Sequence, residues 1–276
     1  MKKIQKDRNK DSYIWKLLLG ICILGLLVCV IVMLVRSVKR SDAEESYAEL
    51  QEMTAPHEDT EEITIEDSSE DKLIELGIEI PDKNINFEEI SQENEDVYAW
   101  IYVPGTKVDY PILQHPTDDS YYLNHNMDGS AGYPGCIYTE SLNEKDFSDP
   151  NTVLYGHNMD DDTMFGSLHD FEDTDFFAEN HYIYVYTAED VYVYQIFAAY
   201  EYPAIHLLYN FNVDDPEVFA DYVAGIYESK GRVVNLREDI EVTAEDKIIT
   251  LSTCTTDHEN SLRFLVQGVL LNEEGE

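Results

Sequence analysis

Basic residues are scarce in this sequence once its first forty positions are passed. Of the 276 residues, 57 are acidic and 18 are Lys or Arg, and nine of those 18 lie at or before Arg40. Proteins that bind nucleic acid neutralise its phosphates with Lys and Arg, so a nucleic-acid partner is excluded for the rest of the chain. The acidic excess is typical of a soluble, non-adhesive surface; attraction of a cationic or amine-bearing partner is the alternative interpretation.

Cysteine is also rare. Cys22 and Cys29 lie in a long apolar run, which leaves Cys136 and Cys254 in the remainder of the chain. So few cysteines exclude a disulfide-rich scaffold, although two of them could form one bond in an oxidising compartment. Cys254 and His258 could also be interpreted as two zinc ligands, but no further Cys/His group at zinc-like spacing accompanies them. We therefore expect neither a metal nor another cofactor.

Charged residues are absent from Leu17 to Val35, where every position is apolar or glycine. At about 1.5 Å per residue, a helix of this length nearly crosses a bilayer core of about 30 Å. A cleaved signal peptide would have an apolar core of only about 7–15 residues and a cleavage site with small residues, and neither is present. The sequence predicts an uncleaved transmembrane anchor over residues 14–35.

The distribution of basic residues around this run predicts its orientation. Six Lys or Arg residues precede the run, and Arg36, Lys39 and Arg40 follow it. By the positive-inside rule, residues 1–13 form a cytoplasmic tail and the remainder of the chain lies outside the membrane. We therefore predict a single-pass protein of the cell membrane with an extracytoplasmic domain.

The segment after the anchor, residues 36–85, is acidic and has few aromatic residues. It shows no sustained apolar periodicity, which predicts a partly disordered stalk. Near its end the pattern changes, because Phe87 and Ile90 are spaced three apart between Asn84 and Asn94. This spacing predicts a short helix that lies on the following domain.

Short segments rich in Val, Ile and Tyr follow, separated by clusters of Gly, Pro, Asn and Asp. Such segments are typical of β-strands. We predict strands within residues 97–103, 108–114, 151–156, 181–187, 191–200, 247–254 and 263–271. Evenly spaced short strands indicate a mostly-β fold, either a closed or nearly closed barrel or a sandwich.

One segment in this region has strong helical periodicity. Apolar residues recur at four-residue spacing between Val218 and Ile226. An aspartate at position 214 or 215 is the expected N-cap, a proline follows in the first turn, and Gly231 suits the stop. We predict a helix over residues 216–230.

Cys254 is the first candidate for chemistry, because it ends the apolar run KIITLSTC. A cysteine at the end of a rigid strand is held in place and still reaches a cleft, as a nucleophile requires. A small buried hydrophobe is the alternative interpretation, since free cysteine is among the most buried residue types. Arg263 begins the next predicted strand, and a hairpin would bring it near Cys254. Arginine keeps its charge and could stabilise an oxyanion; a surface ion pair is its alternative role.

A nucleophilic cysteine needs a histidine or a similar base. The free thiol has a pKa of about 8.5, so little thiolate exists at neutral pH, and a leaving amine needs a proton. The chain has eight histidines, and periodicity does not distinguish among them. His157 is favoured because it follows a predicted strand and a glycine, in a loop position where functional residues are common. His258 is its rival.

The motifs TLSTC, RFLVQG and YGHN together resemble the signature of sortases, and the resemblance extends over about residues 87–271. The blocks NEDVYAWIYVPGTKVDYPILQ, DDSYYL, GCIYTE and YGHNMDDDTMFGSL resemble class B. This resemblance implies an eight-stranded β-barrel with an N-terminal helix and a helix between strands six and seven, preceded by the transmembrane helix. It also implies a catalytic domain over residues 86–272 on the surface of a Gram-positive bacterium.

The resemblance further implies roles for individual residues. Cys254 would be the nucleophile that forms an acyl thioester, His157 the general acid/base, and Arg263 the residue that positions the substrate and stabilises the oxyanion. Three residues would line the groove for the sorting peptide: Leu123, Ser252 and Thr253. The implied reaction cleaves a C-terminal sorting signal after a threonine. Its partners would be surface proteins that carry the signal and an amine of a peptidoglycan precursor or cross-bridge.

Two alternatives to this function stay open. One is a surface cysteine protease with water as the acceptor, and the other is a non-catalytic acidic binding module in which Cys254 is merely buried. Cys136 departs from the family pattern, which usually has Ser or Thr at that place. We expect it to be a buried structural thiol and not a second nucleophile.

Overall fold

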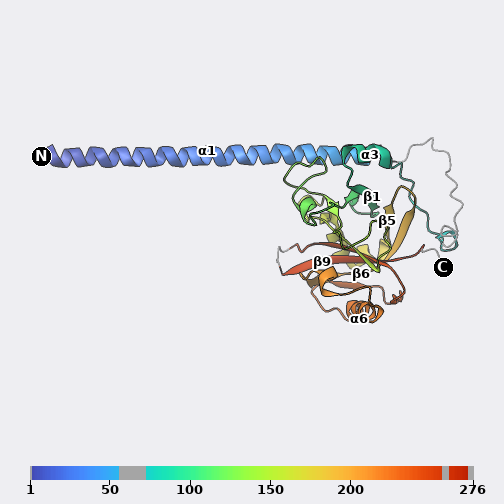
Figure 1. Ribbon diagram of the computed structural model, residues 1–276. Helices are drawn as coiled ribbons and strands as arrows, with labels where there is room; N and C mark the ends of the chain where they lie inside the picture. Colours follow the sequence, from blue (N-terminus) through green and yellow to red (C-terminus); the bar gives the residue numbers. More distant parts are fainter. Residues whose placement is uncertain (1, 56–72, 257–260, 273–276) are drawn as a thin grey trace.

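The computed structural model describes residues 2–55, 73–256 and 261–272, and for residues 2–14 it describes the backbone alone. The helices of the described chain (Figure 1) are α1 (Lys2–Met53), α3 (Phe87–Glu93), η1 (Tyr121–Leu123), η2 (Gly166–Glu172), α4 (Thr174–Glu179), α5 (Leu207–Asn210) and α6 (Pro216–Tyr227). The strands are β1 (Val97–Tyr102), β2 (Asp109–Leu113), β3 (Ile137–Tyr138), β4 (Asn151–Tyr155), β5 (Tyr182–Tyr186), β6 (Val191–Pro203), β7 (Val234–Leu236), β8 (Ile248–Cys254) and β9 (Leu262–Leu270).

Eight of these strands form a closed barrel in the order β5-β1-β2-β3-β4-β8-β9-β6, and pairing of β5 with β6 closes it. The first half of β6 pairs with β5, and its second half pairs with the additional strand β7. The pairs β2–β3 and β4–β8 are parallel, and the other pairs are antiparallel. The predicted eight-stranded barrel is confirmed, and each predicted strand segment contains an observed strand. The short strands β3 and β7 were not predicted.

The central strands are buried on both faces. On β8, Ile249 and Leu251 pack in the core inside the barrel, whereas Ile248 packs in a second core outside it. On β9, Phe264 belongs to the inner core and Leu265 to the outer one. Successive side chains of a strand point to opposite faces. The even-numbered residues of β8 and the odd-numbered residues of β9 therefore face the outside of the barrel.

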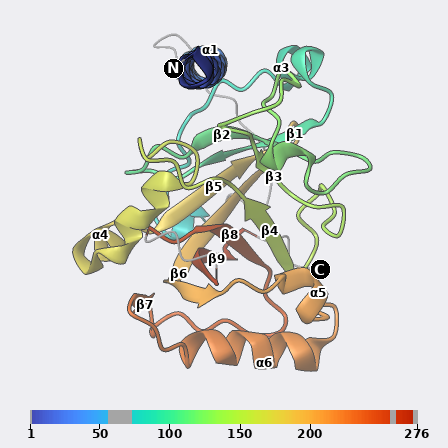
Figure 2. The same cartoon turned by 90° about the vertical axis from the view of Figure 1, so that its left-hand side faces the viewer.

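Helix α6 covers the outer core, and Figure 2 shows it on the opposite side of the barrel from α1 and α3. Asp215 is its N-cap and accepts a hydrogen bond from the backbone N–H of Glu217, and a proline occupies the first turn. Phe219 and Ile226 are buried on its inner face. The predicted helix is confirmed, although it ends at Tyr227 and not at residue 230. When the eight barrel strands are counted along the chain, α6 lies between the sixth, β6, and the seventh, β8.

The predicted stalk is wrong for residues 41–53, because α1 continues without a break to Met53 and its last turns pack on the barrel. Ala43, Tyr47 and Leu50 are buried at helical spacing. Only three apolar positions form this face within an acidic sequence, so the periodicity is too short to stand out. Farther along, Leu73 is also in the inner core. Residues 56–72 of the predicted stalk lie outside the described residues.

The apolar run predicted to span a membrane lies within α1. Between Trp15 and Met53, one 18-residue stretch of the helix has a mean hydropathy of 3.3, and none of that stretch is buried. Its length and composition are compatible with a single membrane span. The short predicted helix is confirmed as α3, in which Ile90 is buried and Asn86 caps the first turn.

The packing of α1 predicts a difference between two residues on its last turn. Leu50 is 6 % exposed, and Met53 is 46 % exposed. We expect Leu50→Ala to lower the free energy of unfolding by about 2–5 kcal/mol, because it leaves a cavity against the barrel. The control Met53→Ala should change it by about 0.5 kcal/mol or less. The measurement is denaturant unfolding of residues 36–276, and equal effects of the two variants would contradict docking of α1.

Candidate active site

The carboxyl ends of β4 and β8 meet at one edge of the barrel because the two strands are parallel. Tyr155 is the register partner of Ser252, and the chain continues from them to His157 and Cys254. Beyond the ladder, Thr253 Oγ1 donates a hydrogen bond to the Gly156 carbonyl oxygen at 2.9 Å. The residues that flank His157 are therefore tied to the end of β8, which places the two candidate groups side by side.

Cys254 and Arg263 are register partners across the antiparallel pair β8–β9. Side chains at directly opposed positions lie on the same face, with Cβ atoms about 4.5–5.5 Å apart. By strand parity both side chains are on the outer face of the barrel, with Ser252 and Leu265. Cys254 is exposed, and Arg263 is half-buried. The predicted proximity of this pair at the mouth of the hairpin is confirmed.

His157 is held by the segment around η1 and by the loop that follows it. Its Nε2–H donates to the Leu123 carbonyl oxygen at 2.6 Å, and its ring lies 4.8 Å from that of Tyr133. Burial lowers the pKa of His157, and the hydrogen bond to Leu123 partly opposes this shift. With Nε2 as the donor, the neutral ring presents Nδ1 as its basic nitrogen.

Two residues that the sequence analysis missed hold the backbone of Cys254. The Cys254 carbonyl oxygen accepts hydrogen bonds from Asn158 Nδ2 at 3.2 Å and from His169 Nε2 at 2.9 Å. His169 Nδ1 lies 2.6 Å from Glu172 Oε1, and its ring stacks on Phe264. Both ring nitrogens of His169 therefore face acceptor oxygens, one on a side chain and one on the backbone of Cys254. Both residues belong to the block YGHNMDDDTMFGSLHD, but nothing in their spacing indicates a contact with Cys254.

Cys136 is buried, whereas Cys254 is exposed. Cys136 is 1 % exposed, and both thiols are free. Its Sγ lies 3.2 Å from the Tyr47 hydroxyl and donates to the His125 carbonyl oxygen at 3.4 Å. Burial raises the pKa of the Cys136 thiol to about 12. The expectation of a buried structural thiol is therefore confirmed.

The three residues expected to line the peptide groove differ in exposure. Leu123 is 37 % exposed, and Ser252 and Thr253 are 7 % and 2 % exposed. Ser252 shares the face of Cys254, whereas the side chain of Thr253 is on the inner face and binds the Gly156 carbonyl group. Their roles toward a peptide stay predictions. His258, the rival of His157 and the second residue of the zinc alternative, lies outside the described residues.

Known proteins are similar to this chain in sequence and in fold. The family model described as "Sortase domain" matches residues 101–271. Sortase B of Listeria monocytogenes is 34 % identical over 189 residues, which cover 67 % of this chain and 74 % of that protein. The structure of sortase B from Bacillus anthracis in complex with AAEK1 has a TM-score of 0.65 at 26 % identity, with 84 % of this chain and 98 % of that chain covered. A Staphylococcus aureus sortase B–substrate complex has a TM-score of 0.62 at 25 % identity, with coverages of 86 % and 100 %.

The environments of Cys136 and Cys254 predict selective labelling. We expect iodoacetamide at neutral pH to modify Cys254 in native residues 36–276 and to leave Cys136 unmodified, because the thiolate is the reactive form and burial keeps Cys136 protonated. In denaturant both should react. Peptide mass spectrometry of each cysteine measures the two rates, and comparable labelling of Cys136 in the native protein would contradict the assignment.

Proposed function

Since the chain belongs to the sortase family, and its relatives and structural neighbours are class B enzymes, we propose that its barrel is the catalytic domain of a cell-surface cysteine transpeptidase. In this proposal residues 86–272 form the catalytic domain, residues 14–35 span the membrane once, and residues 1–13 lie in the cytoplasm of a Gram-positive bacterium. The single observation that supports the mechanism best is the pairing of Cys254 with Arg263 beside the end of β4, where His157 follows.

The first half-reaction is acylation of Cys254. The thiolate attacks the carbonyl carbon of the threonine in the sorting signal, a C–S bond forms, and the carbonyl becomes an oxyanion. When the oxyanion collapses, the C–N bond breaks, and His157 in its protonated form supplies the proton to the leaving amine. The product is an acyl thioester on Cys254 and a released C-terminal peptide.

The second half-reaction transfers the acyl group to an amine of a peptidoglycan precursor or cross-bridge. His157 accepts a proton from the attacking amine, the new amide bond forms, and the Cys254 thiolate leaves. Arg263 lies on the same face and supplies fixed positive charge to both oxyanions. His169 and Asn158 keep the end of β8 in place, so the sulfur keeps its position through both steps.

The sorting peptide is proposed to bind along the outer face at the ends of β4 and β8. Leu123 offers an exposed apolar side chain there, and Ser252 shares the face of the nucleophile. Thr253 contributes by fixing Gly156 next to His157. The substrate complex of the Staphylococcus aureus sortase B supports binding of a substrate by this fold.

The function is tested by separating transfer from hydrolysis with a library of peptides that contain a threonine. We expect wild-type residues 36–276 to cleave selected members and to form an amide product when an amine such as triglycine is added.

Cys254→Ala should abolish cleavage, and Cys136→Ser should retain most of it, because only Cys254 is exposed at the strand end. Without an added amine, mass spectrometry should detect an acyl adduct on Cys254. Release of the acid alone in the presence of amine would favour the protease with water as acceptor, and no cleavage of any peptide would favour a binding module.

The proposed role of Arg263 depends on the arrangement of its hydrogen-bond donors, so it can be tested separately from its positive charge. Lysine keeps the charge but loses the planar fork of donors, so Arg263→Lys should be nearly as damaging as Arg263→Ala if two donors meet the oxyanion. Loss of one such donor typically lowers kcat by about 10²–10³-fold. Steady-state kcat on one peptide measures this, with circular dichroism as the control for folding. Near-normal turnover of Arg263→Lys would remove Arg263 from the proposed mechanism.

A further inference from the structure

We propose that the membrane-proximal turns of α1 position the imidazole of His157; this inference rests on the acid/base role proposed above for that residue. Three residues of α1 make the relevant contacts: Arg40, Glu44 and Tyr47. Arg40 contacts the loop that follows His157 in the chain, and Tyr47 contacts the loop that packs against its ring. Glu44 orients Arg40.

The first loop, residues 158–164, begins directly after His157 and returns to it. An isolated β-bridge joins Asn158 to Met164, and the Phe165 N–H donates to the His157 carbonyl oxygen at 3.0 Å. Asp162 and Met164 have φ angles of 63° and 54°, in the left-handed region that residues other than glycine rarely adopt. Such a backbone persists only where the surrounding contacts hold it, so what holds this loop also determines the position of His157.

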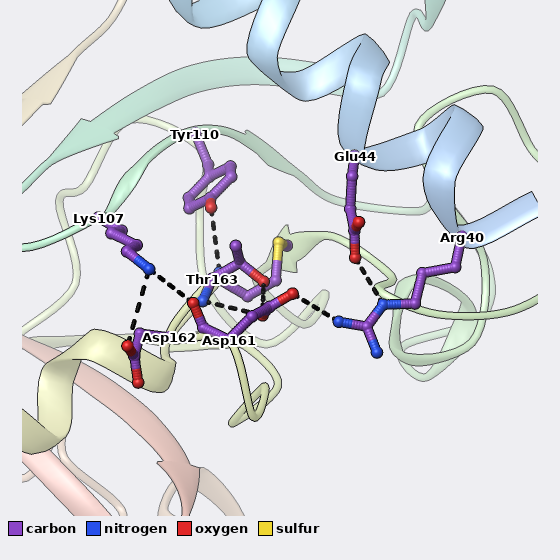
Figure 3. A network of polar contacts seen from close by, with 8 residues as sticks. Arg40, Glu44, Lys107, Tyr110, Asp161, Asp162 and Thr163 are labelled. Carbon is purple, nitrogen blue, oxygen red and sulfur yellow. Dashed lines mark hydrogen bonds and ion pairs between the residues drawn. The ribbon is translucent and has the colours of Figure 1, made fainter. Parts of the chain in front are cut away.

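Arg40 binds this loop near its tip. Its Nη2 donates to Asp161 Oδ2 at 2.5 Å, and its Nε donates to Glu44 Oε1 at 2.5 Å, which orients the guanidinium. The other oxygen of Asp161 accepts a hydrogen bond from the Thr163 hydroxyl at 2.6 Å. Lys107 Nζ donates to the Asp161 carbonyl oxygen at 2.6 Å. Figure 3 shows Asp161 between Arg40 and Lys107, so two cations from separate elements fix the loop.

Tyr47 binds the second loop and reaches the end of the first. It is 5 % exposed, and its hydroxyl donates to the Gly135 carbonyl oxygen at 2.8 Å. Gly135 abuts the imidazole, because a Cβ atom there would lie 3.4 Å from His157 Cδ2. The ring of Tyr47 also packs edge-on against Tyr110, whose hydroxyl accepts the Met164 N–H at 3.1 Å.

The ion pair itself contributes little to global stability, because the side chains of Arg40 and Asp161 are 38 % and 41 % exposed. Its effect is local to the loop. Although partial burial opposes it, the hydrogen bonds of Thr163 and the charge of Arg40 lower the pKa of Asp161, so the pair persists at neutral pH. Arg40 is five residues beyond the apolar run. The helix that anchors the protein is therefore the helix that holds the proposed acid/base.

The test uses the full chain in lipid nanodiscs with Arg40→Met, Asp161→Asn and the double variant. The matched control is Lys39→Met, which removes the neighbouring exposed cation of the same helix. Two readouts are followed against pH: kcat and KM on a cleaved threonine peptide, and the rate of Cys254 alkylation by iodoacetamide. Titratable or charged groups on the segments around His157 also include Tyr121, Tyr122, His125, Tyr133, Cys136, Asp160, Asp162, His169, Cys254 and Arg263, and all stay unchanged in these variants.

We expect Arg40→Met and Asp161→Asn each to lower kcat about tenfold with KM within about twofold, since misplaced catalytic groups cost up to about 10²-fold. The pH profile of Cys254 alkylation should shift in both, and the double variant should lose no more than either single one. Tyr47→Phe, which keeps the ring and removes the hydroxyl, should also shift the profile. Wild-type kcat and pH profiles in Arg40→Met and Tyr47→Phe would overturn the inference, provided that His157→Ala abolishes turnover. If His157→Ala leaves both readouts unchanged, the proposed function fails instead.

Discussion

The parallel pairing of β4 with β8 is the constraint on which the site depends. An antiparallel pair would place the carboxyl end of one strand beside the amino end of the other, and His157 and Cys254 would lie at opposite edges of the barrel. The parallel register, from Asn151 with Ile248 to Tyr155 with Ser252, instead delivers both residues to one edge. The hairpin of β8 and β9 then adds Arg263 on the same face. Strand pairing thus brings His157, Cys254 and Arg263 together at the ends of β4, β8 and β9.

Burial of both faces makes this arrangement rigid. Residues of β4, β8 and β9 alternate between a core inside the barrel and a core beneath α6. A shift of one residue would exchange the two sets and would move buried polar residues such as Thr250 and Gln267 away from their partners. The buried amide of Gln267 on this outer side is paired, because its Nε2 donates to the Tyr222 hydroxyl and to Thr250 Oγ1. Cys254 is the last residue of such a strand, so its backbone is held in place. The hydrogen bonds of His169 and Asn158 to its carbonyl oxygen hold the following peptide group as well.

The docked end of α1 changes the relation between anchor and barrel. A flexible connection would leave the barrel free to move relative to the apolar run, whereas a continuous helix from that run to the buried Leu50 sets the position of the barrel relative to it. Helix α6 and the outer core lie on the other side (Figure 2). The large acidic excess lies after Arg40, in a part of the chain that has nine Lys or Arg residues, Arg263 among them.

The sequence by itself determined the class of fold, most of the strands, the apolar helix and helix α6, because these follow from local periodicity and capping that neighbouring residues carry. It also singled out Cys254, His157 and Arg263, through their places at strand ends and in motifs. Tertiary structure alone decided that Tyr47 and Leu50 are core residues, that the Tyr47 hydroxyl contacts Cys136, and that His169 bonds the Cys254 carbonyl group. These contacts join residues about 85–90 positions apart in the chain. Such distant contacts depend on how the barrel closes, and no spacing within a short segment contains that information.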